Sequence, residues 1–150
     1  LCHHFSWGRD PARGARYLVS AGDWARGIYA NDDAVRYYDR ALCILEYEAE
    51  RRMLLADIAR SRYELDNGET PNDLGHLVPR YLPAIPLDPM DGLPIRYRLG
   101  PRGESVLYSV GPDCRDDDGA PDRPDAKPAT AVSHSRDMVW PTADFARSID

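Results

Sequence analysis

Residues 82–100 read LPAIPLDPMDGLPIRYRLG, and this stretch decides the fold of the chain. Its prolines at 83, 86, 89 and 94 each fix their own φ and push the preceding residue out of the helical region. They therefore predict an extended path with turns. Directly afterwards, Ile95–Leu99 alternates apolar and polar side chains, the pattern of a half-buried strand.

A second strand is expected to return along the first. Gly100-Pro101-Arg102-Gly103 has the chemistry of a turn, and the sequence SVLYSV over 105–110 supplies the returning strand. The pair predicts an antiparallel hairpin, which we expect to lie on a long helix.

That long helix is predicted over residues 47–66, which contain no Gly or Pro. Asn67-Gly68 ends it, because both residues tolerate the left-handed conformation of a helix C-terminus. A shorter helix of about two turns is expected from Thr70-Pro71, a capping residue followed by proline, to Pro79. One helical face, expected to be apolar, is formed by Tyr47, Leu54, Ile58, Ser61 and Leu65.

Two further helices are predicted upstream. Asp10-Pro11 begins the first, since Asp accepts a bond from an orphan amide and Pro presets φ. Asn31-Asp32-Asp33 begins the second in the same way, with negative charge at the positive end of the helix dipole. Its predicted core stripe is formed by Ala34, Tyr38, Ala41 and Leu45.

Composition and charge exclude several classes of protein. The chain has 150 residues and a net charge of −6, and residues 64–150 carry 16 acidic against 9 basic residues. A nucleic-acid-binding protein needs a basic stripe, so DNA and RNA partners are not expected. The longest apolar run, residues 41–45, is far too short to span a bilayer. Three cysteines without CxxC spacing suggest neither a disulfide framework nor a zinc site.

Residues 1–46 resemble degenerate tetratricopeptide-type helical repeats. The resemblance rests on DPARGARYLVSAGDWARGIYANDDAVRYYDRAL, in which small and large residues alternate on successive helices. It implies a protein-interaction scaffold without chemistry of its own. Fewer than about three repeats do not bury a continuous core, so we expect this part to dock on something.

Residues 47–141 resemble the C-terminal globular domain of type II secretion major pseudopilins and related bacterial proteins. The motif residues are Gly68, Pro71, Pro86, Asp88, Pro89, Gly92, Pro94, Tyr97, Ser109, Gly111, Asp113, Asp137 and Met138. The resemblance implies an α+β fold, with a long helix on a small antiparallel sheet, an irregular acidic loop and a closing strand. Two features depart from the family. Pseudopilins carry an apolar membrane segment at the N-terminal end of the long helix, whereas residues 47–66 are charged here and follow repeat-like helices. Cys114 stands where the family usually has Gly.

The acidic loop after the hairpin is the candidate site. Calcium takes six to eight oxygen ligands, which a loop rich in carboxylates and free carbonyls supplies. An EF-hand is excluded because Cys114 stands at its first position and no helices flank it. The resemblance implies a structural calcium, and the alternative is a solvated loop kept soluble by charge. The candidate ligands are Asp113, Asp116, Asp118, Asp125 and Asp137.

No catalytic constellation is predicted. Asp88-Pro89 and Asp91-Gly92 are ordinary turn dipeptides, and no Ser, Cys or His lies in a nucleophile context. The sequence therefore predicts a non-enzymatic protein-interaction or cell-envelope assembly protein, with a protein partner or self-association. The alternative is a cytoplasmic signalling or scaffold fragment that binds its partner through the tetratricopeptide-like helices. Residues 142–150 are expected to form a C-terminal tail.

Overall fold

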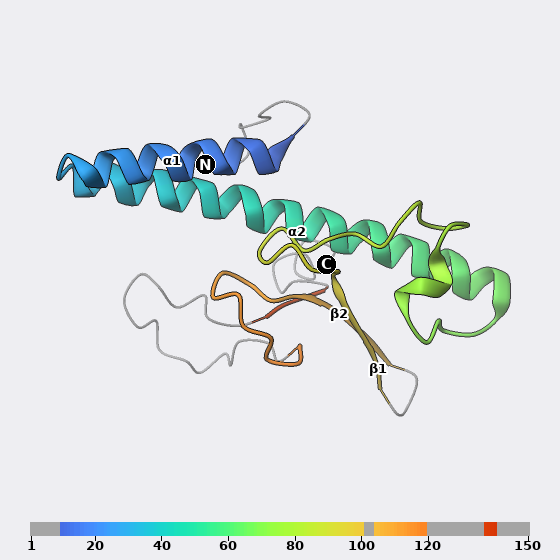
Figure 1. The fold of residues 1–150 in the computed structure, drawn as a ribbon. Coiled ribbons are helices and arrows are strands. Elements are labelled where there is room, and N and C mark those ends of the chain that lie inside the picture. The colour runs from blue at the N-terminus through green and yellow to red at the C-terminus, as the bar shows by residue number, and fades with distance from the viewer. Residues whose placement is uncertain (1–9, 101–103, 120–136, 141–150) are drawn as a thin grey trace, which may run out of the picture. The chain divides into compact units, whose positions relative to one another are not determined.

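The computed structural model describes residues 10–100, 104–119 and 137–140 (Figure 1). The described residues form two long helices, a short 3-10 helix and a three-stranded antiparallel sheet, which confirms the predicted α+β class. The chain divides into two compact units, residues 1–48 and 49–150. The predicted tail at 142–150 lies outside the described residues.

Helix α1, Pro11–Gly27, begins as the sequence predicts. The Asp10 carboxylate accepts a hydrogen bond from the Arg13 amide at 3.0 Å, and Pro11 occupies the first helical position. Beyond the helix, Tyr29 adopts a left-handed conformation with φ of 64°, and α2 begins at Asn31.

The first unit packs α1 against the first half of α2. Ala15 and Leu18 of α1 are buried with Ala41 of α2, which confirms part of the predicted stripe. Gly22 is required at this contact, because a Cβ added there would lie 2.6 Å from the Tyr38 ring. The Tyr38 hydroxyl also donates to Asp23 at 2.8 Å.

Helix α2 is longer than predicted. It runs without a break over Asn31–Asn67, 37 residues, and joins two segments that the sequence analysis expected to be separate helices. No Gly or Pro interrupts this span, so nothing in the backbone ends the helix near residue 46. The boundary between the compact units falls within the helix, after Glu48.

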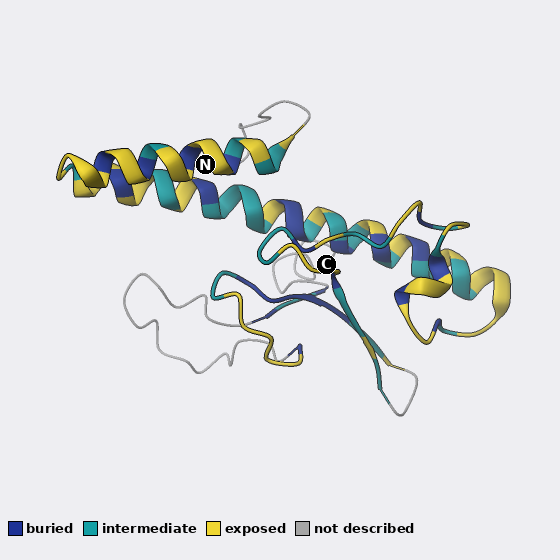
Figure 2. Cartoon of the chain, in the orientation of Figure 1, coloured by how far each residue is buried: buried dark blue, intermediate teal, exposed yellow. Residues whose placement is uncertain are grey.

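The buried face of α2 in the second unit is not the predicted one. This face buries Ala49, Met53, Ala56 and Ala59. Figure 2 colours α2 by burial class and shows buried, intermediate and exposed residues interspersed along the helix. The predicted face is mostly solvent-exposed, with Ile58 49% and Leu65 86% exposed. The alanines lie on the packed face because their small side chains let neighbouring segments approach the helix closely. The positions of the larger apolar residues alone therefore did not identify this face.

The short helix is also shorter than predicted. Residues Leu74–Leu77 form a single 3-10 helix, η2, instead of two α-helical turns. The Asp73 carboxylate accepts from the Gly75 amide at 2.7 Å and so caps this tight turn. Leu77 is fully buried, so the segment contributes to the core although it is short.

The hairpin forms as predicted and gains a third strand. β1 is Arg96–Leu99, β2 is Ser105–Ser109 and β3 is Met138–Trp140, in the order β1-β2-β3 with both pairs antiparallel. In the register, Leu107 of β2 lies between Tyr97 of β1 and Trp140 of β3. The third strand corresponds to the predicted closing segment, and it begins one residue after Asp137.

The second unit has one hydrophobic core. It is built from α2, η2, the segment after η2 and the sheet, with buried members Met53, Ala56, Ala59, Leu74, Leu77, Leu82, Ile95, Leu107 and Trp140. The Trp140 indole donates to the Asp57 carboxylate of α2 at 3.2 Å. This bond fixes the last strand to the helix, so the sheet and the helix share a core.

We expect Met53→Ala to lower the free energy of unfolding by about 2–5 kcal/mol, because it removes a fully buried side chain and leaves a cavity. Leu65→Ala, on the exposed side of the same helix, is the matched control and should change it by less than about 0.5 kcal/mol. Urea unfolding followed by circular dichroism checks both. Equal losses in the two variants would contradict the observed orientation of α2.

Candidate functional site

The turn before β1 is organised around one buried carboxylate. Asp88 is fully buried and accepts hydrogen bonds from the Met90 amide at 3.0 Å, the Ser109 hydroxyl at 2.9 Å and the Val110 amide at 3.0 Å. Arg96 lies 3.3 Å from the same carboxylate. Asp88 therefore ties the proline-rich turn to the far end of β2.

Arg96 connects this turn to the acidic loop. Its guanidinium pairs with Asp91 through both terminal nitrogens, and with Asp88. Its Nε lies 3.5 Å from Oδ2 of Asp116 in the acidic loop. Because the guanidinium side chain is only 15% exposed, these ion pairs are poorly screened by water.

Residues 111–119 form the described part of the acidic loop. Four of them have positive φ, namely Gly111, Cys114, Asp118 and Gly119. Asp113 accepts from the Arg115 amide at 3.1 Å, an arrangement that closes a local turn. The backbone thus folds tightly on itself without regular structure.

Asp116 holds the middle of this described loop against the hairpin. Its Oδ1 accepts from the Tyr108 hydroxyl of β2 and from the Asp118 amide, each at 3.1 Å. Burial, and then the hydrogen bond to Asp116, raise the pKa of Tyr108 to about 12, so the phenol keeps its proton and stays a donor.

Gly119 lies against the ring of the same tyrosine. Its φ is 72°, and an added Cβ would lie 2.9 Å from the Tyr108 ring and 3.2 Å from Val106. Only glycine meets both demands without displacing a neighbour.

Asp137 is the most unusual member of the site. It is 5% exposed, and its Oδ2 accepts from the amides of Asp117 at 3.0 Å and Gly119 at 2.7 Å. Its Oδ1 is buried and has no hydrogen-bond partner among the described residues. Burial raises the pKa of Asp137, with a further contribution from the nearby charges of Asp116 and Asp117, although the two amide bonds oppose this.

The predicted ligands are therefore not equivalent. Asp137 is buried with one free oxygen, Asp116 is bonded to Tyr108 and Arg96, Asp113 caps a local turn, and Asp118 is exposed. Asp125 lies outside the described residues. Within the described residues, no three acidic, His or Cys side chains are grouped as a metal site.

Backbone oxygens are the other donors in the loop. The carbonyls of Asp116, Asp117 and Asp118 accept no backbone hydrogen bond from the described part of the chain. Calcium accepts backbone carbonyls as readily as carboxylates. A trans peptide points its N–H and its C=O in opposite directions, so the Asp116 and Asp118 carbonyls face away from Asp137, whose Oδ2 accepts from the amides that follow them. The donor at this place that fits a hard cation is therefore the buried Oδ1 of Asp137.

Arg96 and Tyr108 also belong to the site, although the sequence pattern did not indicate them. Both residues lie in the predicted strands, where alternation gave them an orientation but no partner. The available signal was the Arg that opens the first strand, five residues after Asp91 and eight after Asp88, since a cation that follows two turn aspartates can fold back to pair with them.

The cysteines differ in state. Cys43 of α2 is disulfide-bonded, contrary to the expectation from the odd cysteine count. Cys114 is a free thiol whose Sγ lies 3.4 Å from the Met90 carbonyl. Desolvation and the charges of Asp91, Asp113 and Asp88 raise the pKa of the Cys114 thiol, which makes it a poor nucleophile at neutral pH.

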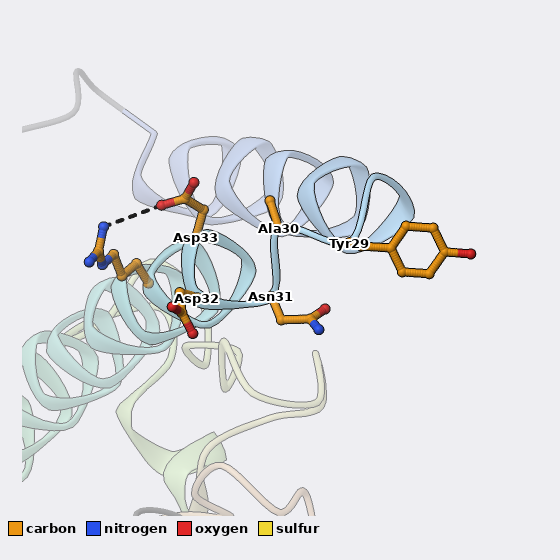
Figure 3. A pocket seen from close by; sticks show the side chains of 6 residues that line it. Tyr29, Ala30, Asn31, Asp32 and Asp33 are labelled. Atoms are coloured by element: carbon orange, nitrogen blue, oxygen red, sulfur yellow. Dashed lines mark hydrogen bonds and ion pairs between the residues drawn. The ribbon is translucent and has the colours of Figure 1, made fainter.

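A hollow of about 480 Å³ lies where α1 turns into α2 (Figure 3). Its lining residues are Tyr29, Ala30, Asn31, Asp32, Asp33 and Arg36. Asp33 and Arg36 form an exposed ion pair at 3.2 Å, and Asp32 and Asp33 lie in the first turn of α2, where they interact favourably with the helix dipole. The hollow is therefore explained by the helix start.

Comparisons of the chain with protein-family models, curated proteins and solved structures found no match. Among the residues that the structure describes, neither helix has the length and apolar character needed to cross a membrane.

Asp91→Asn should destabilise the protein by about 1–3 kcal/mol at pH 7, because it removes the main partner of Arg96. The bond to Arg96 lowers the pKa of Asp91 from 3.8, so its stabilising effect is complete above pH 3.8 and is lost as the pH falls through the lower native value. Denaturant unfolding from pH 2 to 7 measures this. A difference between variant and wild type that stays constant over that range would contradict the ion pair.

Proposed function

We propose that this chain is a non-enzymatic protein-interaction or cell-envelope assembly protein, with a pseudopilin-like module over residues 47–141. Support comes from the residues that carry the resemblance. Asp88 and Ser109, two of its motif positions, are hydrogen-bonded to each other at 2.9 Å in the buried part of the module. A motif whose distant members meet in space is better support than the same residues scattered over a surface.

We also propose a structural calcium in the acidic loop. The observation that carries this is the buried Oδ1 of Asp137, which has no partner in the described part of the chain. A buried carboxylate oxygen without a donor is costly, and a bound cation would remove that cost. Calcium is preferred over magnesium because an irregular loop offers many oxygens at flexible geometry.

The proposed ion would join the loop to the closing strand. Asp137 precedes β3, and its other oxygen already holds two loop amides. The remaining ligands would come from the acidic side chains Asp113, Asp118 and Asp125 and from loop carbonyls other than those of Asp116 and Asp118. The ion is structural in this proposal and has no part in a reaction.

Calcium should raise the melting temperature of the wild-type protein by roughly 5–10 °C at a concentration about 100 times its Kd, because it binds only the folded state. Asp137→Asn should abolish the shift, whereas Asp33→Asn, an exposed acid of the first unit, should keep it. Differential scanning calorimetry with calcium and then with chelator measures the effect. Equal midpoints for the wild type in both conditions would refute the calcium proposal.

The state of the cysteines supports an envelope location. Disulfides persist in oxidising compartments such as the bacterial periplasm and are rare in the cytoplasm, and Cys43 is disulfide-bonded. The chain has three cysteines, of which Cys114 is free.

We expect one reactive thiol per chain in denaturant without reductant, and three after reduction, because two of the three cysteines would be joined. A thiol titration on protein exported to an oxidising compartment counts them. A count of three thiols before reduction would remove this support for an envelope location and would favour the cytoplasmic alternative.

The second candidate function is a cytoplasmic scaffold that binds a protein through the tetratricopeptide-like helices. The observation that favours it is the outer face of α1, on which Tyr17 and Trp24 lie seven residues apart, about two helical turns, and are each 68% exposed. Ile28, the C-cap residue that follows the helix, is 54% exposed. Loss of partner binding in a Trp24→Ser variant, with calcium stabilisation intact, would favour this candidate over the first.

A further inference from the structure

The side chain of Asp116 joins three segments that are distant in the sequence. It lies in the acidic loop, accepts from Tyr108 of β2 and from the Asp118 amide, and is paired with Arg96 of β1. Both of its carboxylate oxygens thus have partners. Asp137, the other carboxylate that holds this loop, has one oxygen engaged and one without a partner among the residues that the structure describes.

The side chain of Arg96, which pairs with Asp116, is itself held in place. Its terminal nitrogens are held by Asp91 and Asp88, and its side chain is mostly buried. A guanidinium fixed on one side by two carboxylates presents its Nε to Asp116 in a set direction. The position of Asp116 is therefore determined by β1 and β2, which belong to the hairpin core.

We propose that Asp116 is a positioning residue that latches the acidic loop onto the hairpin, and that it does not coordinate the cation. With the latch in place, the amides of Asp117 and Gly119 reach Oδ2 of Asp137, and Oδ1 is left without a partner among the described residues, available to a cation. The part of this inference that concerns the cation rests on the calcium proposal above, whereas the latch itself does not.

Electrostatics separate the two carboxylates. A calcium ion bound to Asp116 would lie close to the Arg96 guanidinium, which is 3.5 Å from Asp116 Oδ2, and like charges repel. Asp137 forms no ion pair with a cationic side chain in the described part of the chain, and the charges that raise its pKa are those of Asp116 and Asp117, which are negative. A divalent cation is thus favoured at Asp137 and disfavoured at Asp116.

Four variants test the latch. Asp116→Asn keeps an oxygen that can accept from Tyr108 and the Asp118 amide, whereas Asp116→Ala removes that acceptor. Tyr108→Phe removes the hydroxyl donor and leaves the Asp116 carboxylate in place. Asp137→Asn changes the proposed cation site. Hydrogen exchange of the Asp117 and Gly119 amides, in chelator, reports whether the loop is held. Calorimetric titration with calcium chloride reports the cation site.

In chelator, Asp116→Ala and Tyr108→Phe should each speed exchange of these amides about tenfold or more. Asp116→Asn keeps the Oδ1 acceptor but loses the ion pair with Arg96, so it should speed exchange less than Asp116→Ala does. In titration, Asp116→Asn should keep calcium affinity within about threefold, Asp116→Ala should lower it about tenfold, and Asp137→Asn should abolish binding. Near-ultraviolet circular dichroism confirms that each variant is folded.

Two results would overturn the latch. Loss of calcium binding in Asp116→Asn as complete as in Asp137→Asn would make Asp116 a ligand. Unchanged amide exchange in both Asp116→Ala and Tyr108→Phe would show that Asp116 holds nothing. Absence of calcium binding by the wild type would refute the proposed cation site alone, because the exchange measurements in chelator still decide whether the latch exists.

Discussion

The second unit depends on the burial of one negative charge. The Asp88 carboxylate is removed from water completely, and it is stable there only because the Met90 amide, the Ser109 hydroxyl, the Val110 amide and Arg96 all donate to it. A buried carboxylate that loses its partners costs several kcal/mol. The proline-rich turn, the end of β2 and the start of β1 must therefore be in place together, and the acidic loop is attached to this arrangement through Arg96.

The parts of the fold that could be predicted from the sequence are those that local backbone chemistry determines. Prolines and the alternation over Ile95–Leu99 specified the turn and the hairpin, and the observed register agrees with that pattern. Asp10 and Pro11 specified the start of α1 for the same reason, since a cap and a preset φ act within one turn.

The predictions that failed required knowledge of what packs against what. α2 carries apolar residues on more than one face, so periodicity did not reveal that Met53 and its alanine neighbours are buried and Leu65 is not. The candidate site was only partly predictable in the same way. Asp137 was named through a resemblance, but its free oxygen follows from amides at Asp117 and Gly119, about twenty residues earlier in the chain. The roles of Arg96 and Tyr108 likewise arise from contacts between segments.

The hydrogen bond from Trp140 to Asp57 spans 83 residues and closes the core of the second unit. During synthesis the helix that contains Asp57 leaves the ribosome long before the strand that contains Trp140. Until then the alanine face of α2 lacks part of its cover, and the loop amides lack Asp137. Long-range closure of this kind slows folding, because the chain must lose loop entropy before the contact forms. The second unit thus completes its native core only after Trp140 has been made. Until then the alanine face of α2 stays partly exposed to water.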